Sequence, residues 1–254
     1  MVALVNFKQY LLLIYNQYNF ENTMNPLIQN NVDTNIDENK SFVVCCYFTA
    51  SYKEHAMRLK ESLVLFGLNY HLSQVEDAGY WEANTRIKPY FILEYLKLYP
   101  NMNIVYLDAD ALVKAPLDYF DTIETDISVY VAKGKKGMSH DYLTGTLFFK
   151  NTEATLKFIN QWIEEQSAGK RTQVDQDSFD AAMIKCQSNL SVTPLPSGYI
   201  KIFDRENDGQ VFIEQYQASR GQTKLRRQKI RRRNRIAGVV LIATIGIVLY
   251  SVIN

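Results

Sequence analysis

Residues 103–110 read NIVYLDAD, an apolar run that ends in two aspartates, Asp108 and Asp110. Side chains two positions apart in a β-strand point to the same face, so both carboxylates are expected to project together from the end of the strand. Open α/β sheets hold their ligands at the carboxyl ends of their strands. Paired carboxylates there suit a hard divalent cation, and such a cation suits a diphosphate. The stretch therefore predicts a site for a cation and a diphosphate.

The segments around this run alternate between predicted strands and helices. We predict strands at 41–49, 69–75, 103–108, 126–132 and 143–149, and helices at 52–67, 87–99, 152–166 and 176–185. This alternation is typical of an α/β fold, with a mixed, mainly parallel sheet flanked by helices. Gly67 is expected to end the first helix, and Pro89 falls in the first turn of the second.

The folded domain is predicted to span residues 41–221. Residues 1–40 are interpreted as an N-terminal extension that ends in a polar linker. Three cysteines without a disulfide framework or a metal-binding CxxC pair fit a reducing compartment.

A membrane anchor is predicted at the end of the sequence given. Residues 236–254 hold no charged side chain over 19 positions, and a helix of that length spans the ~30 Å of a hydrocarbon core. The preceding neck, 222–235, holds eight of the 28 Lys and Arg residues. The positive-inside rule then places the neck and the domain on the cytoplasmic side. The alternatives are a buried core helix and, for the neck, a nucleic-acid or nuclear-import patch. The acidic excess of the remaining chain argues against a domain that binds nucleic acid.

Six segments in this order carry a family resemblance. They are FTASY (48–52), WEANTRIKPYFILEYL (81–96), VYLDADALV (105–113), LTGTLFFKNT (143–152), VDQDSFDAAM (174–183) and IEQYQASR (213–220). The chain resembles the GT-A-fold, Rossmann-like glycosyltransferases of the nucleotide-diphospho-sugar transferase superfamily. The resemblance implies transfer of a sugar, hexosyl or related, from a nucleotide-diphosphate donor to a hydroxyl of a glycan, lipid-linked or protein acceptor, with Mn²⁺ or Mg²⁺ at the DxD motif.

The resemblance also implies how the DxD motif, Asp108-Ala109-Asp110, is used. Asp110 is the expected direct metal ligand, and Asp108 is expected to bind the ribose or to act through water. Similar enzymes often carry a histidine near the carboxyl end as a further ligand, but Gln215 stands in that context here. A neutral amide is a poorer ligand than imidazole for Mn²⁺, although its oxygen can serve Mg²⁺. An inactive or weakly active, membrane-tethered protein that binds nucleotide-sugars is therefore the alternative function.

Further donor-binding residues are implied at four segments of the same resemblance. They are Thr49, Ala50 and Tyr52 for the nucleotide base, Asn84 just before a helix start, Lys88 at that start for a phosphate, Thr144, Gly145 and Thr146 for the sugar, and Ser219 and Arg220 for a phosphate. The structural alternatives are an ordinary aromatic residue at a helix start for Tyr52 and a β-bulge for the segment around Gly145.

Asp175 and Gln176 are the predicted catalytic residues, which would contact the sugar or the acceptor. Asp175 is also expected to cap the following helix, and Asp177 is expected to interact with the dipole of its first turn. A phosphatase of the aspartyl-phosphate type also carries a strand-end DxD motif. That fold has the motif on its first strand, whereas about 60 residues of α/β pattern come first here.

Overall fold

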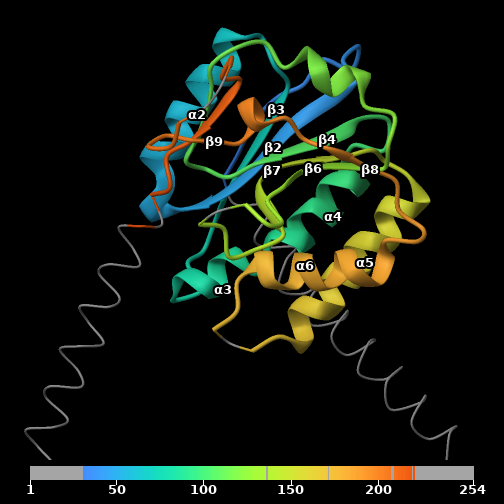
Figure 1. Cartoon of the computed structure of the whole chain (residues 1–254). Coiled ribbons are helices and arrows are strands. Elements are labelled where there is room, and N and C mark those ends of the chain that lie inside the picture. Colours follow the sequence, from blue (N-terminus) through green and yellow to red (C-terminus); the bar gives the residue numbers. More distant parts are fainter. Residues whose placement is uncertain (1–30, 136, 171, 207–208, 219, 221–254) are drawn as a thin grey trace, which may run out of the picture. The chain divides into compact units, whose positions relative to one another are not determined.

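The structure of the chain is a computed structural model that describes residues 31–135, 137–170, 172–206, 209–218 and 220 (Figure 1). The chain divides into two units, Met1–Tyr216 and Gln217–Asn254, and each is considered by itself. Within the described ranges, no helix is both long enough and apolar enough to cross a membrane. The predicted neck at 222–235 and anchor at 236–254 lie outside the described residues, so both stay predictions.

Seven strands form the main sheet in the order β1-β3-β2-β4-β7-β6-β8. Their bounds are Val32–Asn35 (β1), Phe42–Thr49 (β2), Tyr70–Val75 (β3), Asn103–Leu107 (β4), Ile127–Val131 (β6), Tyr142–Phe149 (β7) and Val192–Pro194 (β8). Strand β2 is parallel to β3 and β4, and β6 is parallel to β8. The pairs β1–β3, β4–β7 and β6–β7 are antiparallel.

The sheet is therefore mixed, as predicted, but it is not mainly parallel, because three of its six strand pairs are antiparallel. A parallel neighbour needs a long crossover, usually a helix. Only residues 132–141 join β6 to β7, and none of them that the structure describes is helical. The two strands consequently pair as a hairpin.

The predicted polar linker is also wrong at its carboxyl end, because Val32–Asn35 forms strand β1. This strand pairs with β3 at the edge of the sheet, and its residues are mostly exposed. An edge strand is held by backbone hydrogen bonds and needs no apolar side chains, so its polar sequence gave no strand signal.

The predicted helices are present within a few residues of their expected bounds. They are α2 (Lys53–Leu65), α4 (Lys88–Leu98), α5 (Glu153–Ala168) and α6 (Asp175–Cys186), with the short α3 (Trp81–Thr85) in addition. Gly67 ends α2 as expected, with a φ of +61°. The Leu68 amide donates to the Leu63 carbonyl at 2.9 Å, which completes the C-terminal cap.

Strand β2 explains why the run FVVCCYFT is apolar throughout. Val43, Cys45 and Tyr47 point into one core, and the residues between them point into the other. Helices α4, α5 and α6 cover the first face of the sheet, whereas α2 lies on the second (Figure 1). A strand buried on both faces has no polar side, which is typical of the centre of an α/β sheet.

A second, smaller sheet lies beside α2. It joins β5 (Ala111–Val113), β10 (Ile213–Gln215) and β9 (Lys201–Ile202) in that order. The small sheet brings the segment after residue 200 next to the DxD motif.

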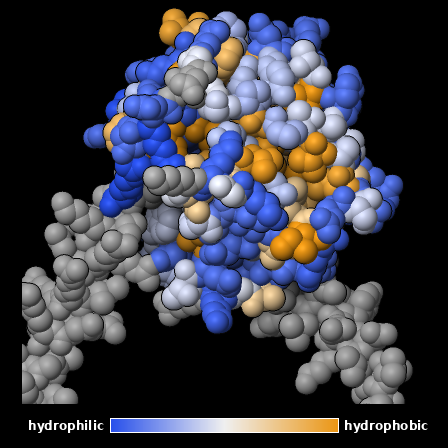
Figure 2. Space-filling view, viewed as in Figure 1, coloured by the Kyte–Doolittle hydropathy of each residue, from blue (hydrophilic) through white to orange (hydrophobic). Residues whose placement is uncertain are grey.

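In the view of Figure 2, hydrophilic side chains cover most of the surface and hydrophobic ones gather in small patches.

His71 is expected to make the domain sensitive to acid. Burial lowers the pKa of His71 from 6.5 to about 4. Its Nε2 has no hydrogen-bond partner among the described residues, and Nδ1 meets the Tyr99 hydroxyl at 2.6 Å. The unfolded chain therefore binds a proton at a pH where the folded chain does not, and stability is lost as the pH falls below 6.5. We expect this residue alone to cost about 2 kcal/mol of unfolding free energy between pH 7 and pH 5.

Urea unfolding of the wild type and of His71→Gln at both pH values checks this. The variant should lose about 2 kcal/mol less between the two conditions, since glutamine does not titrate. Equal losses in the two proteins would contradict the expectation.

Candidate active site

The two aspartates of the DxD motif flank the turn that joins the two sheets. Strand β4 ends at Leu107, and β5 begins at Ala111. The Ala111 amide donates to the Asp108 carbonyl at 2.9 Å, and the Tyr216 amide donates to the Asp110 carbonyl at 3.1 Å. Both aspartates therefore lie just past the strand, and a turn rather than strand alternation sets their directions.

A bulge in β7 brings a second strand against the motif. Val129 pairs with Leu147 but Tyr130 pairs with Leu143, so residues 144–146 are left out of the pairing with β6. The Gly145 carbonyl instead accepts from the Asp108 amide at 3.0 Å. The structural alternative for this segment, a β-bulge, is thus present. Bulges are common beside active sites, so it is compatible with the predicted sugar contacts.

Because Gly145 has no side chain, the side chains of Asp108 and Gln215 can both lie next to it. A β-carbon at Gly145 would lie 3.3 Å from both Asp108 Oδ2 and Gln215 Cδ. These two groups are therefore close neighbours, although they are far apart in the sequence. A side chain at position 145 would push them aside.

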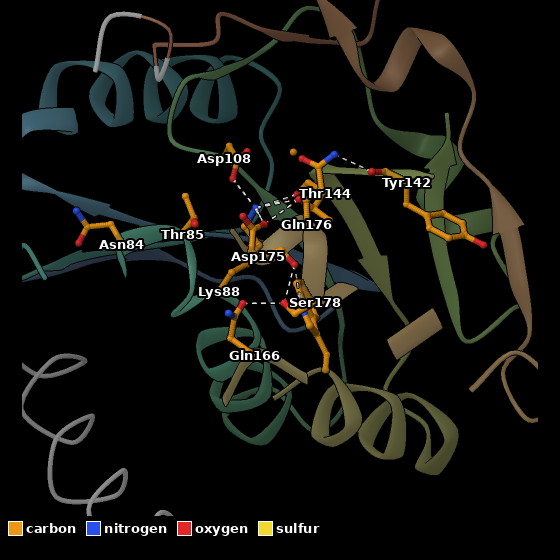
Figure 3. Close-up of polar contacts among 12 residues, drawn as sticks. Asn84, Thr85, Lys88, Asp108, Tyr142, Thr144, Gln166, Asp175, Gln176 and Ser178 are labelled. Carbon is orange, nitrogen blue, oxygen red and sulfur yellow. Dashed lines mark hydrogen bonds and ion pairs between the residues drawn. The ribbon is translucent and has the colours of Figure 1, made fainter. Parts of the chain in front are cut away.

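Lys88 joins the DxD motif to the predicted catalytic aspartate (Figure 3). Its Nζ lies 3.0 Å from Asp108 Oδ1 and 2.6 Å from Asp175 Oδ2. It also donates to the Thr144 carbonyl at 3.2 Å. The lysine side chain is 3% exposed, so its ammonium is surrounded by these oxygens. The structure brings the four predicted residues together, while the predicted phosphate contact of Lys88 stays a prediction.

The charges of this cluster shift the pKa values of its members. Burial raises the pKa of Asp108 to about 6, opposed by the nearby Lys88 and supported by the charges of Asp110 and Asp175. Burial alone would lower the pKa of Lys88, but the two carboxylates raise it above its usual value. Lys88 therefore stays charged. The Asp108 side chain is still 37% exposed, so a ligand can reach it.

Asp175 is held from two sides. Its Oδ2 accepts from the Thr144 hydroxyl at 2.8 Å, and its backbone carbonyl accepts from the Trp162 indole at 3.1 Å. It is the first residue of α6, and its side chain makes no cap, so the prediction of Asp175 as the N-cap is wrong. Asp177 binds the Val174 amide at 2.8 Å instead. With Lys88 bound to its carboxylate, Asp175 faces the site rather than the helix end.

The amide groups of Gln176 and Gln215 are both engaged by the bulged strand. Gln176 Nε2 donates to the Tyr142 carbonyl at 2.8 Å. Gln215 Nε2 donates to the Gly145 carbonyl and to the Thr146 hydroxyl, both at 3.0 Å. The carbonyl oxygen of Gln215 is then the atom that can bind a cation.

The predicted nucleotide-binding residues lie at the ends of β2 and α3. Thr49 is buried and its hydroxyl meets the Ser51 hydroxyl at 3.0 Å, while Ala50 is exposed. The Asn84 side chain accepts from the Ala78 amide at 2.8 Å and donates to Asp77, so it organises the preceding loop. Asn84 therefore has a structural role, and its contact with the donor stays a prediction.

Tyr52 carries an unused polar group beside the DxD motif. Burial, with the charges of Asp110 and Asp108, raises the pKa of Tyr52 to about 12. Its hydroxyl is buried and makes no hydrogen bond of good geometry to a described residue, although an interaction with the Trp81 side chain opposes the rise of its pKa. A buried hydroxyl without a partner costs free energy, so this position suits a ligand that accepts or donates a hydrogen bond.

The last two predicted phosphate-binding residues cannot be related to this cluster. Ser219 lies outside the described residues, and Arg220 belongs to the separate unit Gln217–Asn254. Arg220 Nε donates to Gln217 Oε1 at 2.6 Å. Both roles stay predictions.

Within the described part of the chain, no group of three or more His, Cys, Asp or Glu side chains is placed to hold a metal ion. The candidate donor set is instead two carboxylates, Asp108 and Asp110, with the amide oxygen of Gln215. All three provide oxygen, the donor atom that Mg²⁺ prefers and that Mn²⁺ accepts. These three oxygen donors therefore suit a hard divalent cation, although only two of them are charged.

The hydrogen bonds that hold the backbone of Asp175 were not predicted from the sequence. The Trp162 indole also donates to the Ser178 hydroxyl at 3.0 Å. Ser178 in turn lies 2.8 Å from the Asp175 carbonyl and 2.7 Å from Gln166 Oε1. One signal was available, because Ser178 follows Asp175 by three positions and shares its helix face.

Comparison with solved structures identifies the class of fold. A glycosyltransferase involved in the glycosylation of the major capsid of PBCV-1 matches with a TM-score of 0.55 and 11% identity, over 70% of this chain and 94% of that one. The bifunctional glycosyltransferase WbbM matches with a TM-score of 0.50 and 13% identity, over 72% of this chain and 47% of that one. No curated protein matches the chain. The fold is that of the GT-A glycosyltransferases.

The family follows from the sequence match. The family model for nucleotide-diphospho-sugar transferases matches residues 78–229, which is more than half of the chain. The chain therefore belongs to the nucleotide-diphospho-sugar transferase family, as its six segments predicted. The matched range contains Lys88, the DxD motif, the bulged strand and Asp175.

Proposed function

We propose that the chain is a metal-dependent glycosyltransferase that moves a sugar from a nucleotide-diphosphate donor to a hydroxyl acceptor. The observation that carries the proposal is the chain of ion pairs from the partly exposed Asp108 through the buried Lys88 to the buried Asp175. Lys88 holds the Asp108 carboxylate, which suits a cation and a diphosphate, next to the Asp175 carboxylate, which suits a sugar. Reactions of this kind need such fixed charges where the leaving group develops its own charge.

Asp110, Asp108 and the amide oxygen of Gln215 would hold the cation. Bound there, a Mn²⁺ or Mg²⁺ ion would offset the negative charge that grows on the departing diphosphate. Lys88 binds Asp108 through Oδ1, so Oδ2, which lies next to Gly145, is the oxygen left to bind a cation. A side chain at Gly145 would displace this oxygen.

The remaining residues of the chain would orient the donor. The Tyr52 hydroxyl offers a hydrogen bond close to the motif. Asp175 has one carboxylate oxygen bound by Lys88 and Thr144, and its other oxygen would accept from a sugar hydroxyl. Gln176, tied to the Tyr142 carbonyl, would lie beside that sugar. Precise positioning of this kind supplies much of the rate enhancement in transfer reactions.

The membrane tether is proposed together with this activity. Residues 236–254 would anchor the chain, and the basic neck would keep the domain on the cytoplasmic side. An enzyme held there would act on a glycan, a lipid-linked or a membrane-associated protein acceptor.

A second candidate is a protein that binds nucleotide-sugars without transferring them. Two observations favour it. The third donor to the cation is the neutral amide of Gln215, and Lys88 already neutralises part of the charge of Asp108. Both would weaken a metal site.

A donor panel separates the two candidates. Full-length protein in detergent is incubated with common nucleotide-sugars, with Mn²⁺, with Mg²⁺ or with chelator, and both melting temperature and release of nucleoside diphosphate are measured. The enzyme predicts metal-dependent stabilisation and release for at least one donor. Stabilisation without release supports the binding protein. Indifference to every donor overturns both.

A further inference from the structure

An aromatic side chain is exposed on the small sheet, close to the DxD turn. Phe203 directly follows β9, the edge strand of that sheet (Figure 1), and the residue is 43% exposed. Every other Phe, Tyr and Trp that the structure describes is less exposed than this one. Aromatic rings supply much of the binding energy at many interfaces. An exposed ring beside a candidate active site therefore points to a ligand.

The Phe203 ring is supported by the ring of Tyr216. The two rings are parallel to within 6°, and their centroids are 5.9 Å apart. Tyr216 is itself fixed, because its hydroxyl donates to Glu214 Oε2 at 2.9 Å. The position of the Phe203 ring is therefore set before a ligand arrives, so that binding on it orders few side chains.

Backbone hydrogen bonds connect both aromatic residues to the expected cation donors. The Tyr216 amide donates to the Asp110 carbonyl, and the Phe203 amide donates to the Gln215 carbonyl, both at 3.1 Å. Asp110, Tyr216 and Phe203 thus lie side by side across the three strands. Since neighbouring strands are about 5 Å apart, the backbone of Phe203 is about 10 Å from that of Asp110.

The two rings lie beside the donor site rather than in it. Successive side chains of a strand point to opposite faces, so Tyr216 and Phe203 leave the small sheet on the face opposite to Gln215. A ligand that stacks on Phe203 would therefore lie close to the DxD motif without displacing a cation or its diphosphate.

The charged groups around the ring pair balance one another. Lys114 Nζ lies 3.3 Å from Glu214 Oε2 and 3.5 Å from the Tyr216 hydroxyl. The segment that carries Phe203 holds two basic and two acidic residues, Lys201, Arg205, Asp204 and Glu206. With no excess of either sign, this surface favours neither a phosphate nor a cation.

A flat apolar ring with a polar surround of no net charge suits a neutral sugar. The C–H bonds on one face of a pyranose ring are weakly positive and pack against the negative face of an aromatic ring. The sugar hydroxyls can exchange hydrogen bonds with Lys114, Glu214 and Tyr216. A nucleotide base would also stack on an aromatic ring, but its phosphates would need a basic surface beside it.

We propose that Phe203, supported by Tyr216, binds one pyranose ring of the acceptor glycan, at a position other than the reacting sugar. The inference rests on the proposed function for the identity of the glycan as the acceptor. Phe203 would then determine specificity, because an acceptor of several sugars reaches this ring and a single sugar in the donor site does not.

The test uses full-length protein in lauryldimethylamine oxide, a detergent without a sugar head group. It is titrated with methyl glycosides of glucose, galactose, mannose, fucose, xylose and N-acetylglucosamine, and binding is followed by saturation-transfer NMR. Phe203→Ala removes the ring, Phe203→Leu keeps an apolar side chain without a ring, and Phe203→Trp keeps an aromatic one. Leu98→Ala is the matched control, since Leu98 is 52% exposed and lies on α4. The melting temperature of each variant checks folding.

At least one glycoside should bind the wild type, Phe203→Trp and Leu98→Ala in the millimolar range. Phe203→Ala should weaken that binding by about 10-fold and Phe203→Leu by about 3-fold or more. Absence of binding by all six glycosides, or binding that both variants leave unchanged, overturns the proposal.

Two other ligands of the ring are tested with the same samples. If Phe203→Ala weakens binding of nucleoside diphosphate with Mn²⁺ instead, the ring binds the donor base. If the variant instead dissociates a dimer in sedimentation, the ring binds a second copy of the chain. Either result overturns the proposal.

The donor panel described above separates this proposal from the proposed function. Glycoside binding that depends on Phe203, without turnover of any donor, would overturn the transferase and keep Phe203 as a sugar-binding residue. Donor turnover without glycoside binding at Phe203 would overturn the subsite and keep the transferase.

Discussion

Replacing Lys88 with methionine is expected to lower the free energy of unfolding by about 3–5 kcal/mol and to abolish sugar transfer. The ammonium lies within 3.0 Å of Asp108 and 2.6 Å of Asp175, and the lysine side chain is 3% exposed. Without it, two neighbouring carboxylates face each other with no cation between them. Urea unfolding and donor turnover of the same preparations measure the two effects.

Two variants show whether the loss comes from the buried charges. Lys88→Met combined with Asp175→Asn removes one carboxylate as well, so it should be more stable than the single variant. Lys185 also pairs with a carboxylate, that of Glu165, but its side chain is 58% exposed. Lys185→Met should therefore change stability by no more than about 1 kcal/mol. A cost below about 1 kcal/mol for Lys88→Met would refute the assignment of a buried ion-pair centre.

Asp110→Ala is expected to reduce metal-dependent turnover by about 10²–10³-fold or more, with little loss of stability. The residue lies in the turn between β4 and β5, and its backbone carbonyl accepts from the Tyr216 amide, a hydrogen bond that alanine keeps. The fold should therefore tolerate alanine, while the cation loses its expected direct ligand. Turnover against Mn²⁺ concentration, with the melting temperature as a check on folding, makes the measurement.

Asp118→Ala is the matched control for this prediction. Asp118 is exposed, begins the 3₁₀ turn Asp118–Thr122 on the connection after β5, and is not part of the site. Its variant should keep wild-type turnover and metal dependence. Unchanged turnover in Asp110→Ala would show that the DxD motif has no part in the chemistry.

Local sequence patterns predicted most of the elements. The apolar run of β2, the turn at Gly67 and the spacing of apolar residues in α5 are short-range signals, and each element lies where the sequence placed it. The candidate site residues were predicted because they lie in six segments of a family pattern, and they stay predictions. Their roles came from that resemblance, not from spacing.

Features that depend on contacts between residues far apart in the sequence were not predictable from local patterns. The edge strand β1 has a polar sequence and exists because β3 offers it backbone partners. The antiparallel pairing of β7 depends on what joins it to β6. The contact of Lys88 with Asp175 joins residues from two helices, and no local pattern contains it.

The contacts that complete the site join residues far apart in the sequence, and this separation has a consequence for biosynthesis. Gln215 reaches Gly145 across 70 positions, and Lys88 reaches Thr144 across 56. Chains emerge from the ribosome with their N-terminal part first. The main sheet can form early, but the DxD turn gains its partner strand β10 only once residue 215 has been released. A nascent chain stopped before that point would carry the sheet and yet have an open donor site, so nucleotide-sugars could stabilise only chains synthesised past β10.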